Sequence, residues 1–261
     1  MERKLSLYLC GGGCWKKIKI LSKIMLYLIG LGLWDEKDLS LRALEILKSC
    51  DEIFLETYTS LWKGNLKNLG INAREIKRKE IEEETEKILD IAKNKNVAIL
   101  VPGDPLVATT HSSILIEARK RKINAEIIHN ASVFTAISET GLQLYKFGKT
   151  ASISWTYSEY PYDVLKQNKS IGAHTLFLLD LEPKAMTPKE GLKRLLEIED
   201  KRRENLLDEN SFCLVVCKLG SSEKKIYKGT IKELLNIEEV PGAIILPSNL
   251  HFSEREFIEL Y

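Results

Sequence analysis

The sequence predicts an α/β protein of two domains, and three observations support this fold class. From residue 25 onward, short apolar runs alternate with amphipathic stretches, a pattern typical of β–α units. Residues 97–101 are five consecutive apolar residues, as expected for a strand buried on both faces of a parallel sheet. After residue 130 strand-like runs outnumber helical ones, which indicates a second domain with a mixed sheet. The chain has 261 residues, enough for two modest hydrophobic cores.

Residues 1–24 differ from the rest of the chain. They contain six lysines and arginines and one acid, so their net charge is +5. The whole chain has a formal charge of +2, which leaves residues 25–261 with a net charge of −3. Three glycines at 11–13 interrupt an apolar stretch that is too short for a signal-peptide core. We expect residues 1–24 to be a disordered extension or the product of an upstream start codon. The mildly acidic remainder argues against nucleic acid as a partner.

The composition also bears on location and on metal binding. The longest uncharged run, residues 24–34, has 11 residues and two glycines, too few for a membrane span, so we expect no membrane partner. The five cysteines are scattered, and the pairs Cys10/Cys14 and Cys213/Cys217 have three intervening residues and no histidine nearby. This spacing favours reduced thiols in a cytoplasmic protein over a metal site. Cys213 and Cys217 should face the same side of one strand.

The expected first domain covers residues 25–132 and alternates strands with helices. A helix over 38–49 would be capped by Asp38, with Leu41, Leu44 and Leu47 on one face. Another helix would start near His111, with Thr109 or Thr110 as its cap. The expected strands are 25–29, 52–56, 75–77, 97–101 and 125–129, and the remaining helix is 80–93. This spacing predicts a largely parallel sheet.

The expected second domain covers residues 133–261. A helix start at 131–138, with Ser132 able to cap it, joins the two domains. The expected strands are 151–155, 174–179, 212–218, 225–228 and 243–246, and the expected helices are 188–205, 230–236 and 253–260. Since no repeat or flexible linker separates the two parts, we expect them to share a tight cleft.

The turn after residues 97–101 is the first candidate for a functional site. Two prolines bracket a glycine and a carboxylate in residues 102–105, which makes the turn rigid. Open α/β proteins bind small molecules at the carboxyl ends of such strands, although an ordinary β–α connection has the same elements. The turn alone leaves both interpretations open.

Other chemistries find little support. Gly30 and Gly32 suggest a dinucleotide-binding loop, whose motif requires a third glycine at position 35. That residue is Asp35, whose negative charge would repel the pyrophosphate that approaches the helix start in such a site. The chain has no GxSxG or Walker motif, and its four histidines are far apart.

Four motifs together resemble the diphthine synthase family, part of a larger tetrapyrrole-methylase-like group of S-adenosylmethionine-dependent methyltransferases. They are residues 25–33 (MLYLIGLGL), 58–61 (YTSL), 102–111 (PGDPLVATTH) and 141–149 (GLQLYKFGK). The Gly-Asp-Pro turn is shared by the whole group, whereas its extension to His111 is more specific to diphthine synthases. The resemblance runs in order from Met25 to about His251.

This resemblance implies a two-domain tetrapyrrole methylase-like fold, a cytoplasmic homodimer, and S-adenosylmethionine in a cleft between the domains. The implied substrate is elongation factor 2, whose modified histidine carries an amine that is methylated repeatedly. No metal is implied, and no residue is identified as a general base. The implied cofactor contacts are Leu33, Asp104, Val107, Ser132, Val133, Leu179, Leu219 and Gly242.

These residue types suit the implied cofactor. A carboxylate at Asp104 can face an ammonium and a sulfonium, the apolar side chains can enclose adenine, and Gly242 permits close approach to the backbone. Leu179 and Leu219 could equally be core residues that end strands. The aromatic group Trp155, Tyr157, Tyr160 and Tyr162 could hold methylated ammonium or serve as loop packing.

Two rival functions remain open from the sequence. One is a methyltransferase of the same fold that acts on a tetrapyrrole or on ribosomal RNA. The other is a non-catalytic module that binds a translation factor.

Overall fold

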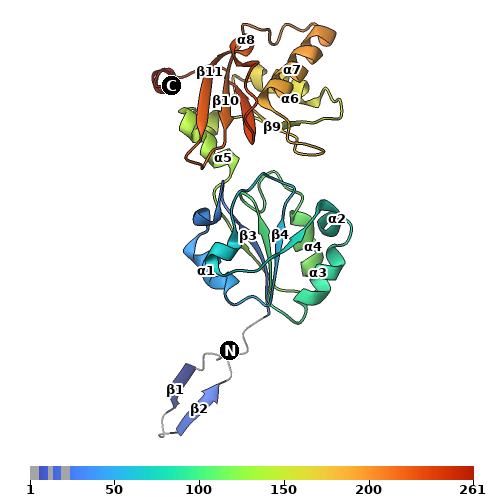
Figure 1. Cartoon of the computed structure of the whole chain (residues 1–261), viewed down its shortest axis with the longest axis vertical. Coiled ribbons are helices and arrows are strands. Elements are labelled where there is room, and N and C mark those ends of the chain that lie inside the picture. The colour runs from blue at the N-terminus through green and yellow to red at the C-terminus, as the bar shows by residue number, and fades with distance from the viewer. Residues whose placement is uncertain (1–5, 11–13, 19–23) are drawn as a thin grey trace.

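A computed structural model describes residues 6–10, 14–18 and 24–261 of the chain. Two five-stranded sheets, each with its own helices, lie one above the other along the long axis of the molecule (Figure 1). Strands β1 (Ser6–Cys10) and β2 (Cys14–Ile18) pair antiparallel with each other and with no other strand in the described ranges. The expectation for residues 1–24 falls partly outside the described residues and stays a prediction.

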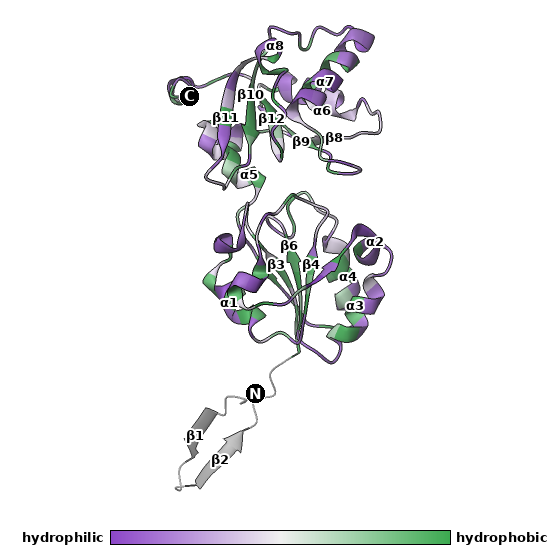
Figure 2. Cartoon of the chain, in the orientation of Figure 1, coloured by the Kyte–Doolittle hydropathy of each residue, from purple (hydrophilic) through white to green (hydrophobic). Residues whose placement is uncertain are grey.

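The first sheet is parallel throughout, as predicted. Its strand order is β5-β4-β6-β3-β7, so β6 lies at the centre. All five residues of β6 are buried, and Figure 2 shows the central strands as the most hydrophobic part of this region. The strands are β3 (Leu26–Gly30), β4 (Glu52–Glu56), β5 (Arg74–Ile76), β6 (Val97–Val101) and β7 (Ala125–Ile128).

Helices cover both faces of this sheet. Helix α1 (Leu41–Leu47) packs on one face through Ala43 and Leu47. Helices α3 (Thr85–Ala92) and α4 (Ser112–Lys120) pack on the other through a separate cluster, and Figure 1 shows α1 across the sheet from them. The short helices η1 (Glu36–Asp38), α2 (Arg78–Glu82) and η2 (Leu66–Leu69) complete this part.

The predicted cap of the first helix was wrong, and its predicted face was right for Leu44 and Leu47 but wrong for Leu41. The N-cap of α1 is Ser40, whose Oγ accepts from the Ala43 N–H at 3.1 Å, because Asp38 is already used in η1. Asp38 instead accepts from the Trp34 N–H at 2.7 Å. Leu41 is 80% exposed and does not share the buried face.

Two further helix predictions need correction. The helix predicted over 80–93 is two helices, α2 and α3. The first ends where the N–H groups of Glu83 and Glu84 both donate to the carbonyl of Lys79, at 2.9 Å and 3.1 Å, which interrupts the regular helical pattern. Helix α4 has His111 at its N-cap position, and neither predicted threonine caps it. Thr109 Oγ1 instead donates to the Pro105 carbonyl at 2.7 Å, which closes the turn before the helix.

The second sheet is mixed, as predicted, with strand order β11-β10-β12-β9-β8. Only β8 and β9 pair in parallel; the other neighbours are antiparallel. The strands are β8 (Ala151–Ile153), β9 (Thr175–Leu179), β10 (Phe212–Cys217), β11 (Lys225–Thr230) and β12 (Gly242–Leu246). The helices are α5 (Val133–Ala136), η3 (Ile137–Thr140), η4 (Leu144–Lys146), α6 (Tyr160–Ser170), α7 (Pro188–Arg202), α8 (Ile231–Leu234) and α9 (Phe252–Ile258).

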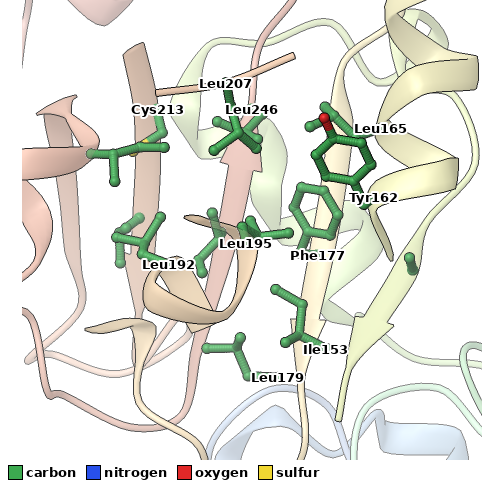
Figure 3. Close-up of a cluster of buried hydrophobic side chains, with 14 of the residues drawn as sticks. Ile153, Tyr162, Leu165, Phe177, Leu179, Leu192, Leu195, Leu207, Cys213 and Leu246 are labelled. Carbon is green, nitrogen blue, oxygen red and sulfur yellow. The ribbon is translucent and has the colours of Figure 1, made fainter. Parts of the chain in front are cut away.

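The larger core of this part lies between the sheet and helices α6 and α7, and a second cluster packs the other face of the sheet against α5, η3 and α9. Figure 3 shows Phe177 and Leu246 of the sheet facing Tyr162 and Leu195 of these helices. Cys213 and Cys217 are both buried in this core and therefore face the same side of β10, as predicted. Within the described residues, no helix is long and apolar enough to cross a membrane.

Candidate cofactor cleft between the two sheets

A cavity of about 400 Å³ lies between the two sheets. Its walls come from the loops after β3, β4 and β6, from the start of α5, from the end of β9, from the loop after β10 and from the start of β12. Cavities of this size commonly hold small organic ligands. All eight residues proposed from the sequence line this one cavity: Leu33, Asp104, Val107, Ser132, Val133, Leu179, Leu219 and Gly242.

The floor of the cavity is the junction between the exits of β3 and β6. Gly32 and Gly103 exchange two backbone hydrogen bonds, of 3.2 Å and 2.8 Å. Both have positive φ, and a Cβ on Gly32 would lie 2.4 Å from the Cβ of Asp38. The two glycines are therefore needed to hold the two strand exits together, which explains the Gly-x-Gly motif without a dinucleotide.

Asp104 ties the turn after β6 to the loop after β7. Its side chain is nearly buried, with Oδ1 accepting from the Leu106 N–H at 3.0 Å. Its Oδ2 accepts from the Asn130 N–H at 3.2 Å and lies 2.7 Å from Nδ1 of His129. The carboxylate thus holds two chain segments of the cavity wall together, in addition to the negative charge it places there.

The opposite wall comes from the second sheet. Leu179 ends β9, Gly242 begins β12, and Leu219 lies in the loop after β10. Gly220 has φ of +89°, and a Cβ there would lie 2.5 Å from the Cβ of Leu33. This close approach brings the β10 loop against the β3 exit and closes the cavity on that side.

A buried group of three titratable side chains lies behind the wall next to β4. Glu56 and His111 are fully buried, and the hydroxyl of Tyr58 lies 3.2 Å from Nε2 of His111. Tyr58 and its neighbour Thr59 line the cavity, whereas Glu56 and His111 do not. Burial lowers the pKa of His111 and raises the pKa values of Glu56 and Tyr58.

Comparison with known proteins agrees with this architecture. The family model of tetrapyrrole (corrin/porphyrin) methylases matches residues 25–235. A diphthine synthase of Methanococcus maripaludis is 44% identical over 249 residues, which cover 90% of this chain and 98% of the relative. A diphthine methyl ester synthase of Schizosaccharomyces pombe is 39% identical over 266 residues, covering 91% and 94%.

A solved structure agrees with the sequence relatives. A crystal structure of diphthine synthase matches with a TM-score of 0.84 and 35% identity, covering 91% of this chain and 95% of that one. The chain belongs to the diphthine synthase family of tetrapyrrole methylases. The resemblance stated from the motifs is therefore confirmed, and the enzyme class is an S-adenosylmethionine-dependent methyltransferase.

For a member of this family, the structure adds residues that sequence reasoning missed. Asp180 follows β9 and lines the cavity, with its carboxylate accepting from the N–H groups of Leu181 at 2.8 Å and Trp155 at 3.2 Å. Arg78 also lines the cavity and reaches across it, since its Nε lies 3.6 Å from a carboxylate oxygen of Glu182. The signal that could have revealed Asp180 is a carboxylate directly after a strand, as at Asp104.

The aromatic group proposed as a site for methylated ammonium lies elsewhere. None of its four members is among the described residues that line the cavity. Lys184 lies 4.7 Å above the ring of Trp155, and Lys201 lies 4.8 Å above that of Tyr157. Tyr162 is fully buried and donates to Glu199 at 2.7 Å. These contacts favour the packing interpretation.

Proposed function

We propose that this protein is a diphthine synthase that binds S-adenosylmethionine in the cavity between the two sheets. It transfers methyl groups to the amine of the modified histidine of elongation factor 2, a step of diphthamide biosynthesis. It acts in the cytoplasm as a homodimer, without a metal, a membrane or a nucleic acid as partner.

One observation carries the cofactor assignment. The eight proposed contact residues come from six separate segments between residues 33 and 242, and all of them line the same cavity. Five are apolar side chains that suit an adenine ring, and the backbone groups beside them can satisfy its ring nitrogens. Asp104 adds negative charge suited to an ammonium and a sulfonium.

The chain's own residues hold and align the reactants. S-adenosylmethionine supplies an electrophilic methyl group when it is bound. The rigid Gly32–Gly103 junction and the Asp104 hydrogen bonds keep the walls in place, so little ordering remains on binding. Alignment of two reactants in this way can supply up to roughly 7–11 kcal/mol of the barrier reduction in favourable cases.

The first test measures cofactor binding by isothermal titration calorimetry. We expect Asp104→Asn to weaken S-adenosylmethionine binding by about tenfold or more, because the amide loses the negative charge and cannot accept hydrogen bonds at both the Oδ1 and the Oδ2 positions. Asp90→Asn is the matched control, since Asp90 lies on α3 and pairs with Lys93 outside the cavity. Equal affinities of wild type and Asp104→Asn would contradict the proposed site.

The second test identifies the acceptor. The protein is incubated with methyl-labelled S-adenosylmethionine and elongation factor 2 that carries the unmethylated intermediate. Label in the factor supports the proposal, and label found only in a porphyrin or in ribosomal RNA would assign the rival function. Cofactor binding without any transfer would favour the non-catalytic module.

A further inference from the structure

Tyr58 and His111 belong to two of the sequence motifs, but neither is among the proposed cofactor contacts. His111 ends the segment 102–111, and its Nδ1 lies 3.3 Å from the carbonyl oxygen of Pro105. A carbonyl only accepts, so Nδ1 carries the proton and Nε2 has a free lone pair. The Tyr58 hydroxyl, 3.2 Å away, therefore donates to Nε2. This leaves the lone pairs of the Tyr58 oxygen for another donor.

Glu56 provides charge behind this pair. Its Oε2 lies 4.0 Å from Nε2 of His111, and both side chains are fully buried. The recorded partners of Glu56 all donate to it: the N–H of Tyr58, the N–H of Thr59 at 2.6 Å, and the Thr59 hydroxyl. This pattern fits an ionised carboxylate that can offset a positive charge on His111.

We propose that Tyr58, backed by His111 and Glu56, receives the proton that the acceptor amine must lose before each methyl transfer. Tyr58 is the member of this group that contacts the substrate, and His111 and Glu56 act through it. The proposal rests on the proposed function, because it requires an amine as the methyl acceptor.

The step balances as follows. An ammonium N–H proton passes to the Tyr58 oxygen as the Tyr58 hydroxyl proton passes to Nε2 of His111, which leaves a neutral amine and an imidazolium beside Glu56. The amine lone pair then forms the new N–C bond as the S–C bond breaks, and the electrons of that bond remain on sulfur. The imidazolium releases its proton to solvent before the next round.

Other charged groups around Tyr58 affect the same equilibrium. The guanidinium of Arg78 lies 5.2 Å from the centre of the Tyr58 ring. Glu82 raises the pKa values of both Tyr58 and His111, and Glu182 raises that of Tyr58. Burial nevertheless lowers the pKa of His111 overall, so the imidazole is neutral at pH 7 and its Nε2 lone pair is free, while the nearby carboxylate of Glu56 offsets the charge that protonation creates.

The kinetic test uses Tyr58→Phe, which removes only the hydroxyl. Single-turnover methylation of elongation factor 2 is followed from pH 6 to 10, with Tyr145→Phe as the matched control, because Tyr145 is 82% exposed and is not among the described residues that line the cavity. We expect Tyr58→Phe to slow transfer at pH 7 by about 100-fold, as for loss of an acid–base group. The loss should shrink at alkaline pH, where the amine releases its proton to water, and cofactor affinity should stay within about twofold.

A wild-type rate and pH profile in Tyr58→Phe would overturn the proposal. Failure of the proposed function is a different result, since the wild-type protein itself would then transfer no label to the factor. A second measurement needs no substrate: imidazole ¹⁵N shifts of the free protein, with the His111 signal assigned by its absence in His111→Gln. We expect a protonated Nδ1 and an unprotonated Nε2 at pH 7, and the opposite tautomer would overturn the relay.

Discussion

Among the residues that the structure describes, two fully buried glutamate–histidine pairs occur, one in each sheet region, and their surroundings differ. Glu56 and His111 lie beside the cavity, whereas Glu254 and His174 lie in the second region and are not among the described residues that line it. Their oxygen–nitrogen distances are 4.0 Å and 3.1 Å. The residue types are the same, so the difference lies in what surrounds them.

In the second pair, every polar atom is engaged within the chain. His174 accepts at Nδ1 from the Ser248 N–H at 3.0 Å, so its Nε2 carries the proton and donates to Glu254. Glu254 also accepts from the N–H groups of Gln143 and His251 and pairs with Lys146. Burial alone would raise the pKa of Glu254, but these partners lower it to about 2.

The two histidines therefore have opposite tautomers and opposite uses. His174 donates from Nε2 to a carboxylate that joins η4, β9 and the start of α9. His111 accepts at Nε2 from a tyrosine of the cavity wall, and its glutamate has no lysine or arginine in hydrogen-bonding contact among the described residues. Both glutamates accept from two backbone N–H groups, so the cation is the main difference: we expect the pair that a lysine neutralises to stabilise the fold, and the pair without a cation to exchange a proton.

The largest expected effect on stability is that of Glu254→Gln. The fall of its pKa from 4.5 to about 2 corresponds to about 3 kcal/mol of folding free energy at pH 7. Because the folded-state pKa is lowered, this stability is present above the unfolded-state pKa and is lost as the pH falls from about 5 to 2. Urea denaturation followed by circular dichroism should show the difference from wild type shrinking over that range.

Glu256→Gln is the matched control for this prediction, because Glu256 is an exposed glutamate on the same helix, α9. Its effect should stay within about 0.5 kcal/mol, as for most surface substitutions. An equal loss in the two variants would mean that the Glu254 network contributes nothing specific.

Lys146→Met should have the next largest effect. The Lys146 side chain is 21% exposed, so its loss should cost less than the roughly 3–5 kcal/mol typical of breaking a fully buried pair, and we expect roughly 2 kcal/mol. Removal of the cation also raises the pKa of Glu254, so the acid limb of the stability curve should move to higher pH. An unchanged acid limb would show that the backbone donors alone hold Glu254 ionised.

The sequence predicted elements whose patterns are local. Strands over 52–56 and 97–101 match β4 and β6 to the residue, because their patterns are visible in the chain itself: 97–101 is a run of five apolar residues, and 52–56 has three apolar residues between two glutamates. Helix α6 was missed because its buried face depends on a distant partner. Tyr162 packs into the core with its hydroxyl on Glu199, and the sequence around it resembles an aromatic loop.

The same distinction applies to the site. The eight cavity residues were assigned through a family resemblance, and the fold brings them together. The group at Tyr58 could not be found that way, because Tyr58 and His111 are 53 residues apart and meet only when β4 and the β6 turn are adjacent. Prediction from the sequence also fails at short range, as the cap of α1 shows. Asp38 was the predicted cap, but it accepts a hydrogen bond from the Trp34 N–H, and Ser40 caps the helix instead.

Glu56→Gln should have the smallest effect on stability, and it tests most directly whether the two buried pairs differ. Burial raises the pKa of Glu56, so the folded state binds a proton more readily than the unfolded state, and wild type gains stability as the pH falls from neutral toward the unfolded-state value. Glutamine resembles the protonated acid, keeps one carbonyl for the Thr59 and Tyr58 donors, and should cost only about 1 kcal/mol at pH 7. Its cost should grow on acidification toward pH 5, opposite in sign to the trend for Glu254→Gln. Urea denaturation gives the stability cost of each glutamine variant at each pH. If the costs of Glu56→Gln and Glu254→Gln changed with pH in the same direction, the two pairs would be equivalent, and the cavity pair would have no separate proton-binding character.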